Sequence, residues 1–225
     1  MATQSQDAPQ RSMEWRYMRL GHVTASRFHD VVPRRASKSG GLSVGATSYL
    51  YELVGELLTD PPMVTPSPSG AALDWGIENE PAAIGAYSMS LDAPVELTGF
   101  HRHPTEPFVG GSPDVLVGDF GICEVKCPLT FREHVRHIQD GPPPHYVSQM
   151  RGLMWVLDRE WCDFVSYDPR VRGDCQVHVR RIERDEKIEK QFTDHVLDFR
   201  DRILEVYQSI TGEQARPLEI DDVRE

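Results

Sequence analysis

Three side chains in the middle of the chain, Asp114, Glu124 and Lys126, have the types and spacing of a hydrolytic site. Because side chains alternate between the two faces of a strand, Glu124 and Lys126 are expected on one face and Val125 on the other. Asp114, on the preceding strand of a hairpin, would then meet Glu124 at one end of the sheet. Two such carboxylates are the oxygen ligands that Mg²⁺ and Mn²⁺ prefer. A nearby lysine can help deprotonate a metal-bound water, which is the chemistry of phosphodiester hydrolysis.

The same three residues also fit a surface hairpin with a cross-strand pair of Glu and Lys, which is common in proteins of every function. With average amino-acid usage, Pro-Asp followed at this distance by Asp/Glu-x-Lys occurs by chance in about one chain in twenty of this length. The motif alone therefore leaves both a catalytic site and a surface hairpin open.

Two further polar side chains lie on segments that are otherwise suited to helices. Glu80 belongs to a segment that predicts a helix over Ala71–Met89, and Gln149 to one that predicts a helix over His145–Leu157. Glu80 can add a third carboxylate beside the sheet, and Gln149 can hydrogen-bond a water or a phosphate. The alternatives are a solvated helix residue for Glu80 and a capping or interhelical hydrogen bond for Gln149.

The elements that would position these residues are strands in the middle of the chain with helices before and after them. Helices are expected at Glu14–Leu20, Thr24–Val32, Leu50–Leu58, Ala71–Met89, Phe131–Gln139, His145–Leu157 and Asp185–Ile210. Strands are expected at Val95–His101, Phe108–Gly110, Asp114–Val117, Ile122–Cys127, Trp161–Ser166 and Cys175–Arg181, with a turn at Gly118–Gly121. This order predicts an α/β fold with a central mixed sheet flanked by helices. We expect a disordered lead-in over 1–12, one domain over 13–212 and a C-terminal tail over 213–225.

Composition limits the classes of protein to which the chain can belong. The 225 residues carry 24 Lys and Arg against 35 Asp and Glu, a formal net charge of −11, which argues against a protein coated in basic residues for phosphate binding. The sequence has no run of 18 apolar residues, so we expect no membrane span. The first residues are polar and lack the apolar region of a secretory signal, which predicts a cytoplasmic protein.

Six motifs, taken together and in order, resemble the phage lambda exonuclease family and its viral recombinase relatives. The resemblance covers residues 13–200 and rests on the motifs Trp15–Ser26, Trp75–Glu80, Gly111–Asp114, Glu124–Pro128, Tyr146–Gln149 and Tyr167–Arg170. It implies a restriction-endonuclease-like PD-(D/E)XK core. It also implies an Mg²⁺-dependent, processive 5′-to-3′ exonuclease that degrades one strand of linear double-stranded DNA to mononucleotides and leaves 3′ overhangs.

The resemblance further implies cofactors, partners and a location. Two Mg²⁺ ions are expected in the site, and Mn²⁺ is expected to substitute for them. The substrate would be a double-stranded DNA end with a 5′-phosphate, enclosed by a ring-shaped homotrimer. A single-strand annealing protein is the expected recombination partner. The protein would act in the cytoplasm of a bacterial host and originate from a phage or prophage.

Residue by residue, the resemblance assigns roles in catalysis. Asp114 and Glu124 match the metal-binding acids, and the backbone carbonyl of Val125 matches a further metal ligand. Lys126 matches the catalytic lysine. The helix carboxylate that supports the second metal or the water corresponds to Glu80, and the helical glutamine near the nucleophile corresponds to Gln149.

The resemblance also assigns a pocket for the 5′-phosphate, which Arg19, Ser26 and Ser112 would form. A guanidinium fork and two hydroxyls suit a terminal phosphate dianion and would draw the strand end forward after each cut. Tyr146 matches a position near the DNA. The basic loop Arg34–Lys38 has no counterpart among the motifs, so the resemblance assigns it no DNA contact.

The histidines, cysteines and aromatic residues suggest other sites, but a position in the core or on a solvated surface explains them better. His101 and His103 can share a strand face without an evident third metal ligand, and His134 and His137 are expected on a solvated helix face. Iron–sulfur and zinc sites are disfavoured because the four cysteines lack the spacing of either. Cys123 and Cys127 share the strand parity of Val125 and are expected to be small buried hydrophobic residues. Four aromatic residues are assigned to the core rather than to base stacking: Trp155, Trp161, Phe164 and Tyr167.

Two alternative functions remain open beside the exonuclease. A structure-specific endonuclease of the same fold would use the same acids and lysine, but it has no need of the 5′-phosphate pocket. A non-catalytic DNA-end-binding scaffold for recombination is disfavoured by the intact set of Asp114, Glu124 and Lys126, because a degenerate nuclease is expected to lose at least one of them.

Overall fold

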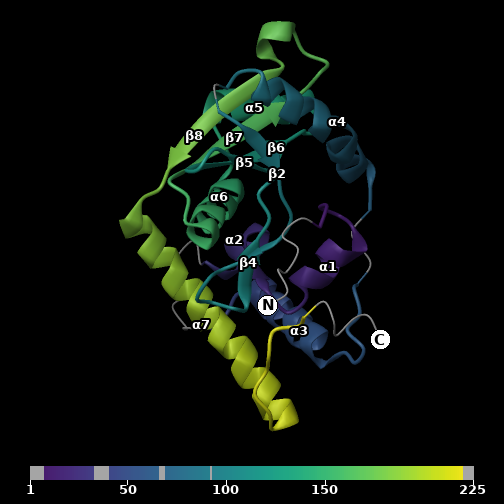
Figure 1. Ribbon diagram of the computed structural model, residues 1–225, viewed down its shortest axis with the longest axis vertical. Coiled ribbons are helices and arrows are strands. Elements are labelled where there is room, and N and C mark those ends of the chain that lie inside the picture. Colours follow the sequence, from purple (N-terminus) through teal and green to yellow (C-terminus); the bar gives the residue numbers. More distant parts are fainter. Residues whose placement is uncertain (1–7, 33–40, 66–68, 92, 220–225) are drawn as a thin grey trace.

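The chain folds around a five-stranded mixed sheet with helices on both of its faces (Figure 1). The structure is a computed structural model that describes residues 8–32, 41–65, 69–91 and 93–219. Its helices are α1 (Met13–Arg19), α2 (Phe28–Val31), α3 (Val44–Leu58), α4 (Ala71–Ser88), α5 (Phe131–Asp140), α6 (Pro144–Leu157) and α7 (Glu186–Thr211). Its strands are β1 (Val23–Thr24), β2 (Val95–Leu97), β3 (His101–Arg102), β4 (Val109–Gly111), β5 (Val115–Val117), β6 (Gly121–Lys126), β7 (Trp161–Tyr167) and β8 (Val177–Glu183). Short 3₁₀ turns occupy Ala25–Arg27 and Gly173–Cys175.

The large sheet has the strand order β2-β5-β6-β7-β8, and a small sheet has the order β1-β4-β3. Strands β6 and β7 run parallel, while the remaining pairs of the large sheet are antiparallel. The predicted mixed sheet flanked by helices is therefore confirmed. Because β6 is paired on both sides, Glu124 and Lys126 project from a strand whose backbone is fixed by two neighbours.

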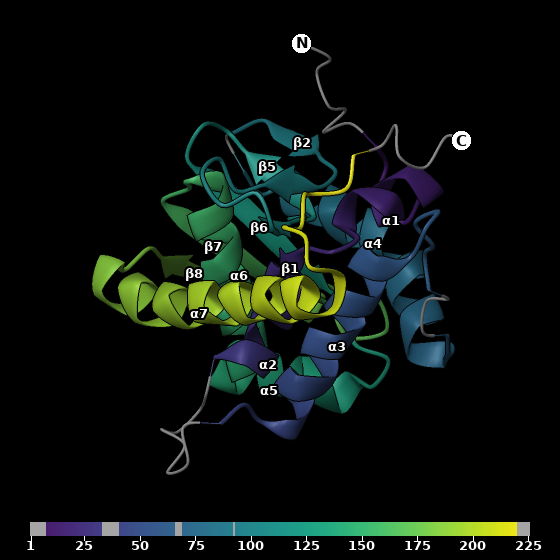
Figure 2. The same cartoon turned by 90° about the horizontal axis from the view of Figure 1, so that it is seen from below.

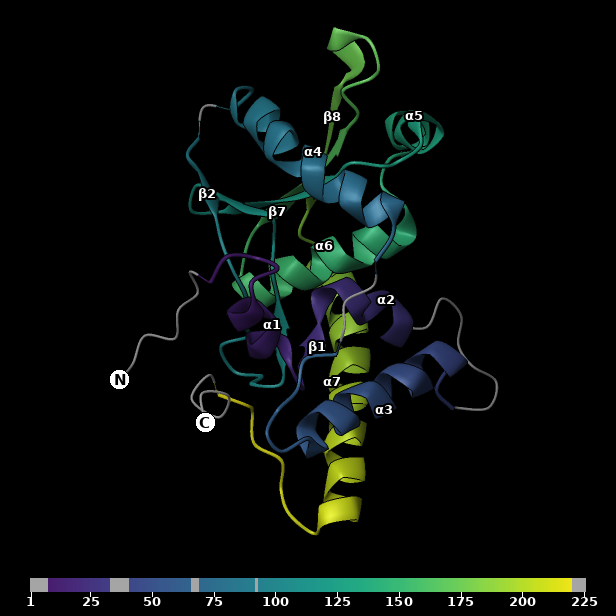
Figure 3. The same cartoon turned by 90° about the vertical axis from the view of Figure 1, so that its right-hand side faces the viewer.

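The sheet separates two hydrophobic clusters according to strand parity. Cys123 and Val125 of β6 face a cluster that includes Tyr87 of α4, whereas Ile122 faces a larger cluster that includes Leu153 of α6. Figure 3 shows α4 and α6 on opposite sides of the sheet. The predicted aromatic residues join these clusters as packing residues: Phe164 and Tyr167 are buried, and Trp155 and Trp161 pack against them.

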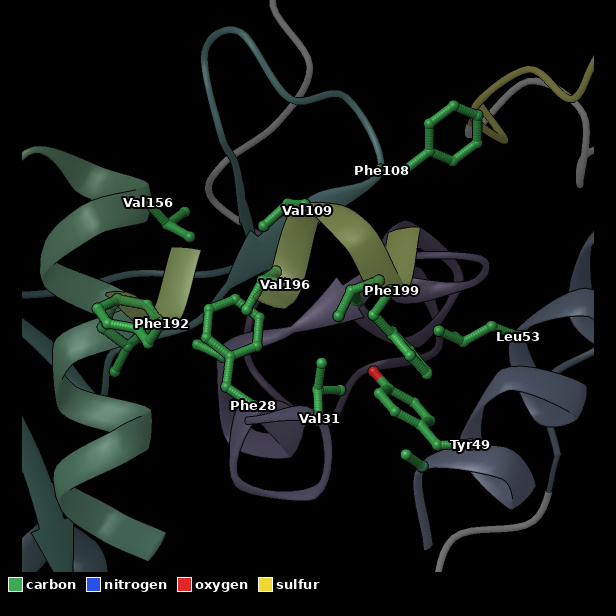
Figure 4. Close-up of a cluster of buried hydrophobic side chains, with 14 of the residues drawn as sticks. Phe28, Val31, Tyr49, Leu53, Phe108, Val109, Val156, Phe192, Val196 and Phe199 are labelled. Carbon is green, nitrogen blue, oxygen red and sulfur yellow. The ribbon is translucent and has the colours of Figure 1, made fainter. Parts of the chain in front are cut away.

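Helix α7 crosses α2 and α3 and completes the larger cluster (Figure 2). Its apolar side chains Phe192, Val196, Phe199 and Ile203 recur at intervals of three and four residues, so that they form one buried stripe. Figure 4 shows three of them, Phe192, Val196 and Phe199, gathered with side chains from the N-terminal helices, including Phe28 and Tyr49. This packing holds the N-terminal third of the chain against the sheet.

Two predicted elements are divided in the structure. The helix expected over Thr24–Val32 begins with β1, which pairs in parallel with β4, and becomes helical only after a 3₁₀ turn. The strand expected over Val95–His101 divides into β2 and β3, which belong to different sheets. Between them Phe100 is buried against Ala8 and Met18, so the chain turns inward where the alternation predicted a continuous strand.

The segment before α1 differs from the expected disordered lead-in. Residues 8–12 pack on the domain: Ala8 is buried, and Gln10 Nε2 donates hydrogen bonds to the carbonyls of Thr98 at 3.2 Å and Pro113 at 2.7 Å. At the other end, Arg102 donates hydrogen bonds to Glu219 and to the carbonyl of Leu218 in the non-helical segment after α7. None of the helices in the described ranges is long and apolar enough to cross a membrane.

Candidate active site

Asp114, Glu124 and Lys126 meet at the end of β6, as their spacing predicted. Lys126 Nζ and Glu124 Oε1 form an ion pair on one face of the strand. Asp114 lies immediately before β5, where its Oδ2 accepts a hydrogen bond of 2.6 Å from the backbone N–H of Val125. The hairpin between β5 and β6 therefore brings both carboxylates to one end of the sheet.

Glu124 has one oxygen that is fully bonded and one that is not. Its Oε1 also accepts a hydrogen bond of 2.6 Å from Gln149 Nε2 on α6, so the predicted glutamine contacts the site. Its Oε2 is buried and has no hydrogen-bond partner among the described residues. A buried carboxylate oxygen without a partner is unfavourable unless a cation or a proton satisfies it. Asp114 and Glu124 thus provide a donor set that fits Mg²⁺ or Mn²⁺.

The charges in this group act strongly on one another. Burial and the neighbouring charge of Glu124 raise the pKa of Asp114 well above its usual range, so this carboxyl resists ionisation without a counter-charge. Burial alone would lower the pKa of Lys126, but the charges of Glu124 and Asp114 outweigh burial and raise it. A divalent cation between the carboxylates would favour their ionised forms and compete with the ammonium for Glu124.

Glu80 lies near these residues but is turned toward a different partner. It lines a cavity of about 330 Å³ together with Lys126 and Tyr146, and its Oε2 pairs with Arg11 Nη2 at 2.5 Å. Within the described ranges, no group of three or more His, Cys, Asp or Glu side chains is placed to hold a metal ion. The structure therefore brings Asp114 and Glu124 together and places Glu80 on the cavity wall.

Tyr146 is at the start of α6, one helical turn before Gln149. Its ring centroid lies 4.9 Å from Lys126 Nζ and 5.8 Å from the centroid of Phe164. An aromatic face near an ammonium stabilises the charge and limits its movement. Tyr146 is therefore placed to fix the lysine in the cavity.

A second cavity, of about 600 Å³, contains two of the three residues predicted for the 5′-phosphate. Arg19 and Ser26 both line it. The guanidinium of Arg19 lies 4.3 Å from the ring centroid of Trp15 and 5.9 Å from that of Phe100. It makes no hydrogen bond or ion pair with any residue that the structure describes. Burial lowers the pKa of Arg19, which is the sign of a cation held away from water without a full counter-charge.

The hydroxyls beside Arg19 are held in different ways. Ser26 Oγ lies 3.3 Å from Thr24 Oγ1, on the wall of the cavity. Ser112 Oγ accepts a hydrogen bond of 2.9 Å from Trp15 Nε1 and is not among the residues that line the cavity. The structure therefore brings Arg19 and Ser26 together and connects Ser112 to them through the indole of Trp15.

The arginine cavity also contains a carboxylate that the sequence analysis did not single out. Glu56 Oε2 accepts a hydrogen bond of 2.8 Å from the backbone N–H of Gly21, and burial raises the pKa of Glu56 to about 7. Gly21 has φ of 69°, and a Cβ there would lie 2.5 Å from Leu57 Cδ2, so this turn requires glycine. Glu56 lies on the polar side of α3, and its spacing in the sequence does not indicate that it contacts Gly21.

The prediction of a solvated face for His134 and His137 is wrong. Both are buried, and Nδ1 of each lies 2.8 Å from Ser166 Oγ on β7. Their spacing of one helical turn fits a helix face that packs on the sheet as well as it fits a solvated face. His137 also lines the cavity of Glu80 and Lys126, and burial lowers its pKa to about 4.

The remaining predicted candidates are placed as follows. His101 Nε2 lies 2.6 Å from Thr98 Oγ1, and His103 packs against Trp155 at a centroid distance of 4.5 Å. Cys123 is buried as predicted, whereas Cys127 is only partly buried. The basic loop Arg34–Lys38 lies outside the described residues.

Residues 14–160 match a domain family described as the YqaJ-like viral recombinase domain, which is more than half of the 225-residue chain. The crystal structure of the alkaline exonuclease LHK-Exo from Laribacter hongkongensis is similar with a TM-score of 0.73 and 35% sequence identity, and covers 89% of this chain and 99% of that chain. Its complex with dAMP gives a TM-score of 0.73, 37% identity and the same coverage. The comparison with curated proteins gives no match.

A more distant structure shares the fold. The phage related exonuclease from Haemophilus somnus 129PT has a TM-score of 0.63 at 18% identity, and covers 84% of this chain and 96% of that chain. The mixed sheet and its flanking helices are thus the fold of the alkaline exonuclease, a PD-(D/E)XK-like nuclease fold, as the resemblance of the motifs predicted.

Proposed function

Because this chain belongs to the YqaJ-like viral recombinase family, we propose that it is a metal-dependent exonuclease that digests one strand of linear duplex DNA from its 5′ end. The observation that carries the proposal is the unpartnered buried oxygen of Glu124 beside Asp114 and Lys126. Family membership and the similarity to alkaline exonucleases support a nuclease. The polarity, the metal and the products are parts of the proposal.

The chemistry assigned to the site follows from its donor set. Mg²⁺ bound by Asp114, Glu124 and the carbonyl of Val125 would polarise the scissile phosphate and lower the pKa of a water, and Mn²⁺ has the same ligand preference. Lys126 would orient that water, and it could accept a proton from it only after a bound cation had replaced the ammonium as the partner of Glu124 and so lowered the pKa of the lysine. Gln149 keeps Glu124 in place through Oε1. Glu80 would support a second Mg²⁺ after it releases Arg11.

The proposed polarity depends on the arginine cavity. Arg19 is a cation without a hydrogen-bonding partner in the described chain, and Ser26 lines the same cavity, so a terminal 5′-phosphate has a guanidinium and a hydroxyl available. Ser112 would join them through a small movement of Trp15. Mononucleotide release is supported by the relative LHK-Exo, whose structure is known in complex with dAMP.

The assembly and the recombination partner are also part of the proposal. A homotrimeric ring around the DNA would make digestion processive, and the 3′ overhang would be passed to a single-strand annealing protein. Sedimentation at micromolar concentration tests the ring: a trimer supports it, and a monomer contradicts it.

The decisive experiment is digestion of end-labelled linear duplexes that carry either a 5′-phosphate or a 5′-hydroxyl. With Mg²⁺ we expect labelled mononucleotides from the 5′ strand, faster initiation at the phosphate, and no products with EDTA. Closed circular plasmid is the control for endonuclease activity. Cleavage of the circle as fast as of the linear DNA would favour a structure-specific endonuclease, and binding without any cleavage would favour a scaffold.

A further inference from the structure

A second cation shares the cavity of the candidate active site. Among the described residues that line this cavity, Arg11 and Lys126 are the two that carry a permanent positive charge. Lys126 is paired with Glu124, which also holds Gln149. Arg11 is therefore the cation that remains for a ligand entering the cavity. Arg11 falls in the stretch over 1–12 for which the sequence predicts a disordered lead-in.

The guanidinium of Arg11 is only partly used. Nη2 contacts Glu80 Oε2 at 2.5 Å, and no hydrogen bond from Nε or Nη1 to the described part of the chain is present. The two side chains remain 39% and 20% exposed, so water screens the pair and it contributes little to stability. A guanidinium has five N–H donors in a planar fork, so most of its donors stay available to a phosphate.

The backbone holds Arg11 in position from both sides. Before it, Gln10 is fixed by the carbonyl of Pro113, the residue next to Asp114. After it, Ser12 caps α1 by accepting a hydrogen bond of 3.1 Å from the N–H of Trp15. Arg11 itself has φ of 71°, a conformation that L-residues rarely adopt. A strained residue between two fixed neighbours is typical of a functional position.

We propose that Arg11 is a substrate-positioning residue, whose guanidinium leaves Glu80 and binds a phosphate of the DNA strand in this cavity. The inference rests on the proposed function, since it assumes that DNA enters there. A phosphodiester accepts two parallel hydrogen bonds from the guanidinium fork. Glu80 accepts only one, and that contact is exposed to water, so binding of the phosphate is the stronger interaction. The same exchange leaves Glu80 free to face the metal-binding acids.

The alternative role is purely structural, in which Arg11 fastens residues 8–12 to α4 through Glu80. The two roles differ in what happens when Glu80 is changed. In the structural role, Arg11→Ala and Glu80→Gln break the same pair and have the same effect. In the proposed role, Arg11→Ala removes a DNA contact, whereas Glu80→Gln removes a competitor for it.

The test is binding of a 5′-phosphorylated duplex to the full chain by fluorescence anisotropy in EDTA, where the DNA is not cut. For Arg11→Ala we expect a Kd about tenfold higher, the loss of one charge-assisted contact. The slope of log K against log salt should fall by about 0.9 for the lost phosphate contact. For Glu80→Gln we expect a Kd that is equal to or lower than that of the wild type, and for Arg11→Lys an intermediate loss, because the fork is gone but the charge stays.

Arg172→Ala is the matched control, because it removes the same charge from a side chain that is 84% exposed and pairs with Asp174. Thermal melts of all variants show whether they fold. An unchanged Kd for Arg11→Ala, an equal loss in Glu80→Gln, or an equal loss in Arg172→Ala would overturn the inference. Digestion of the same duplex by the wild type with Mg²⁺ tests the proposed function separately.

Discussion

The two cavities of this protein differ in the sign of the charged group that lacks a partner. At the edge of the cavity of Lys126, the lysine is paired with Glu124, a buried residue that does not line the cavity, and the unsatisfied group is Oε2 of this glutamate. In the cavity of Arg19, the unsatisfied group is the cation, which stacks on Trp15 without an ion pair among the described residues. The acidic pair beside the first cavity therefore needs a cation, whereas Arg19 in the second cavity needs an anion. An enzyme that binds a metal at one point and a strand end at another needs both.

The supports of the two cavities differ as well. Glu124 and Lys126 project from β6, a strand that is paired on both sides. Arg19 is the last residue of α1, and Ser26 lies in a 3₁₀ turn, so the second cavity depends on side chains such as Tyr49 that tie short elements together. We therefore expect changes in the first cavity to affect chemistry and changes in the second to affect recognition of the strand end.

The largest expected effect is that of Lys126→Ala. Loss of the group that activates the water should reduce the rate of DNA cleavage by about 10³-fold, which corresponds to about 4 kcal/mol in the barrier. DNA binding in EDTA should persist, because the lysine is committed to Glu124 and not to the DNA. Lys187→Ala, at an exposed position on α7, controls for the loss of charge. Full activity of Lys126→Ala would remove the lysine from the mechanism.

Each cavity contains one buried histidine, so acid should destabilise both. His22 lines the arginine cavity and His137 the lysine cavity, and burial lowers the pKa of each from 6.5 to about 4. The unfolded chain takes up these protons near pH 6.5, while the folded chain does not until about pH 4. The stabilisation is therefore complete above pH 6.5, lost as pH falls from 6.5 to 4, and unchanged below that.

For His22, which is 1% exposed, this difference is worth about 3 kcal/mol. Urea unfolding at pH 7.5 and pH 4 measures it, and His22→Gln should remove part of the dependence on pH. The same slope in the variant as in the wild type would show that His22 has the same pKa in the folded and the unfolded chain.

Arg19→Ala tests the anion-seeking cavity and should have a smaller effect on rate. The ratio of initiation at 5′-phosphate ends to initiation at 5′-hydroxyl ends should fall by about 30-fold, the loss of about 2 kcal/mol for a charge-assisted contact. Arg19→Lys should keep only part of the preference, because an ammonium lacks the planar fork. The 5′-hydroxyl duplex is the internal control. A ratio that stays constant would separate Arg19 from the 5′-phosphate.

The part of the site that depends on local periodicity can be predicted from the sequence. The parity of Glu124, Val125 and Lys126 gave the correct face for each, and the hairpin brought Asp114 to them. Residues whose role depends on contacts distant in the chain cannot be predicted in this way. Arg11 reaches Glu80 across 69 positions, and His137 reaches Ser166 across 29. Neither contact is indicated by periodicity: Arg11 lies before the first helix, and a buried polar side chain such as His137 has the same spacing on a helix as an exposed one.

The smallest expected effect distinguishes the supports of the two cavities through their tyrosines. The hydroxyl of Tyr49 accepts the N–H of Thr24 at 3.0 Å and lies 3.3 Å from the carbonyl of His22, so Tyr49→Phe leaves two buried backbone groups unsatisfied. We expect a loss of about 1 kcal/mol and a lower Tm by about 2–4 °C. The ring of Phe keeps the stacking on Phe199, at a centroid distance of 5.6 Å.

Tyr146→Phe is the matched change in the lysine cavity, where the ring and not the hydroxyl makes the contacts to described residues. It should leave Tm unchanged, because the strands hold that cavity without the tyrosine hydroxyl. Equal losses in the two variants would mean that both cavities depend on side-chain hydroxyls for their shape, and the contrast between a sheet-supported site and a side-chain-supported one would fail.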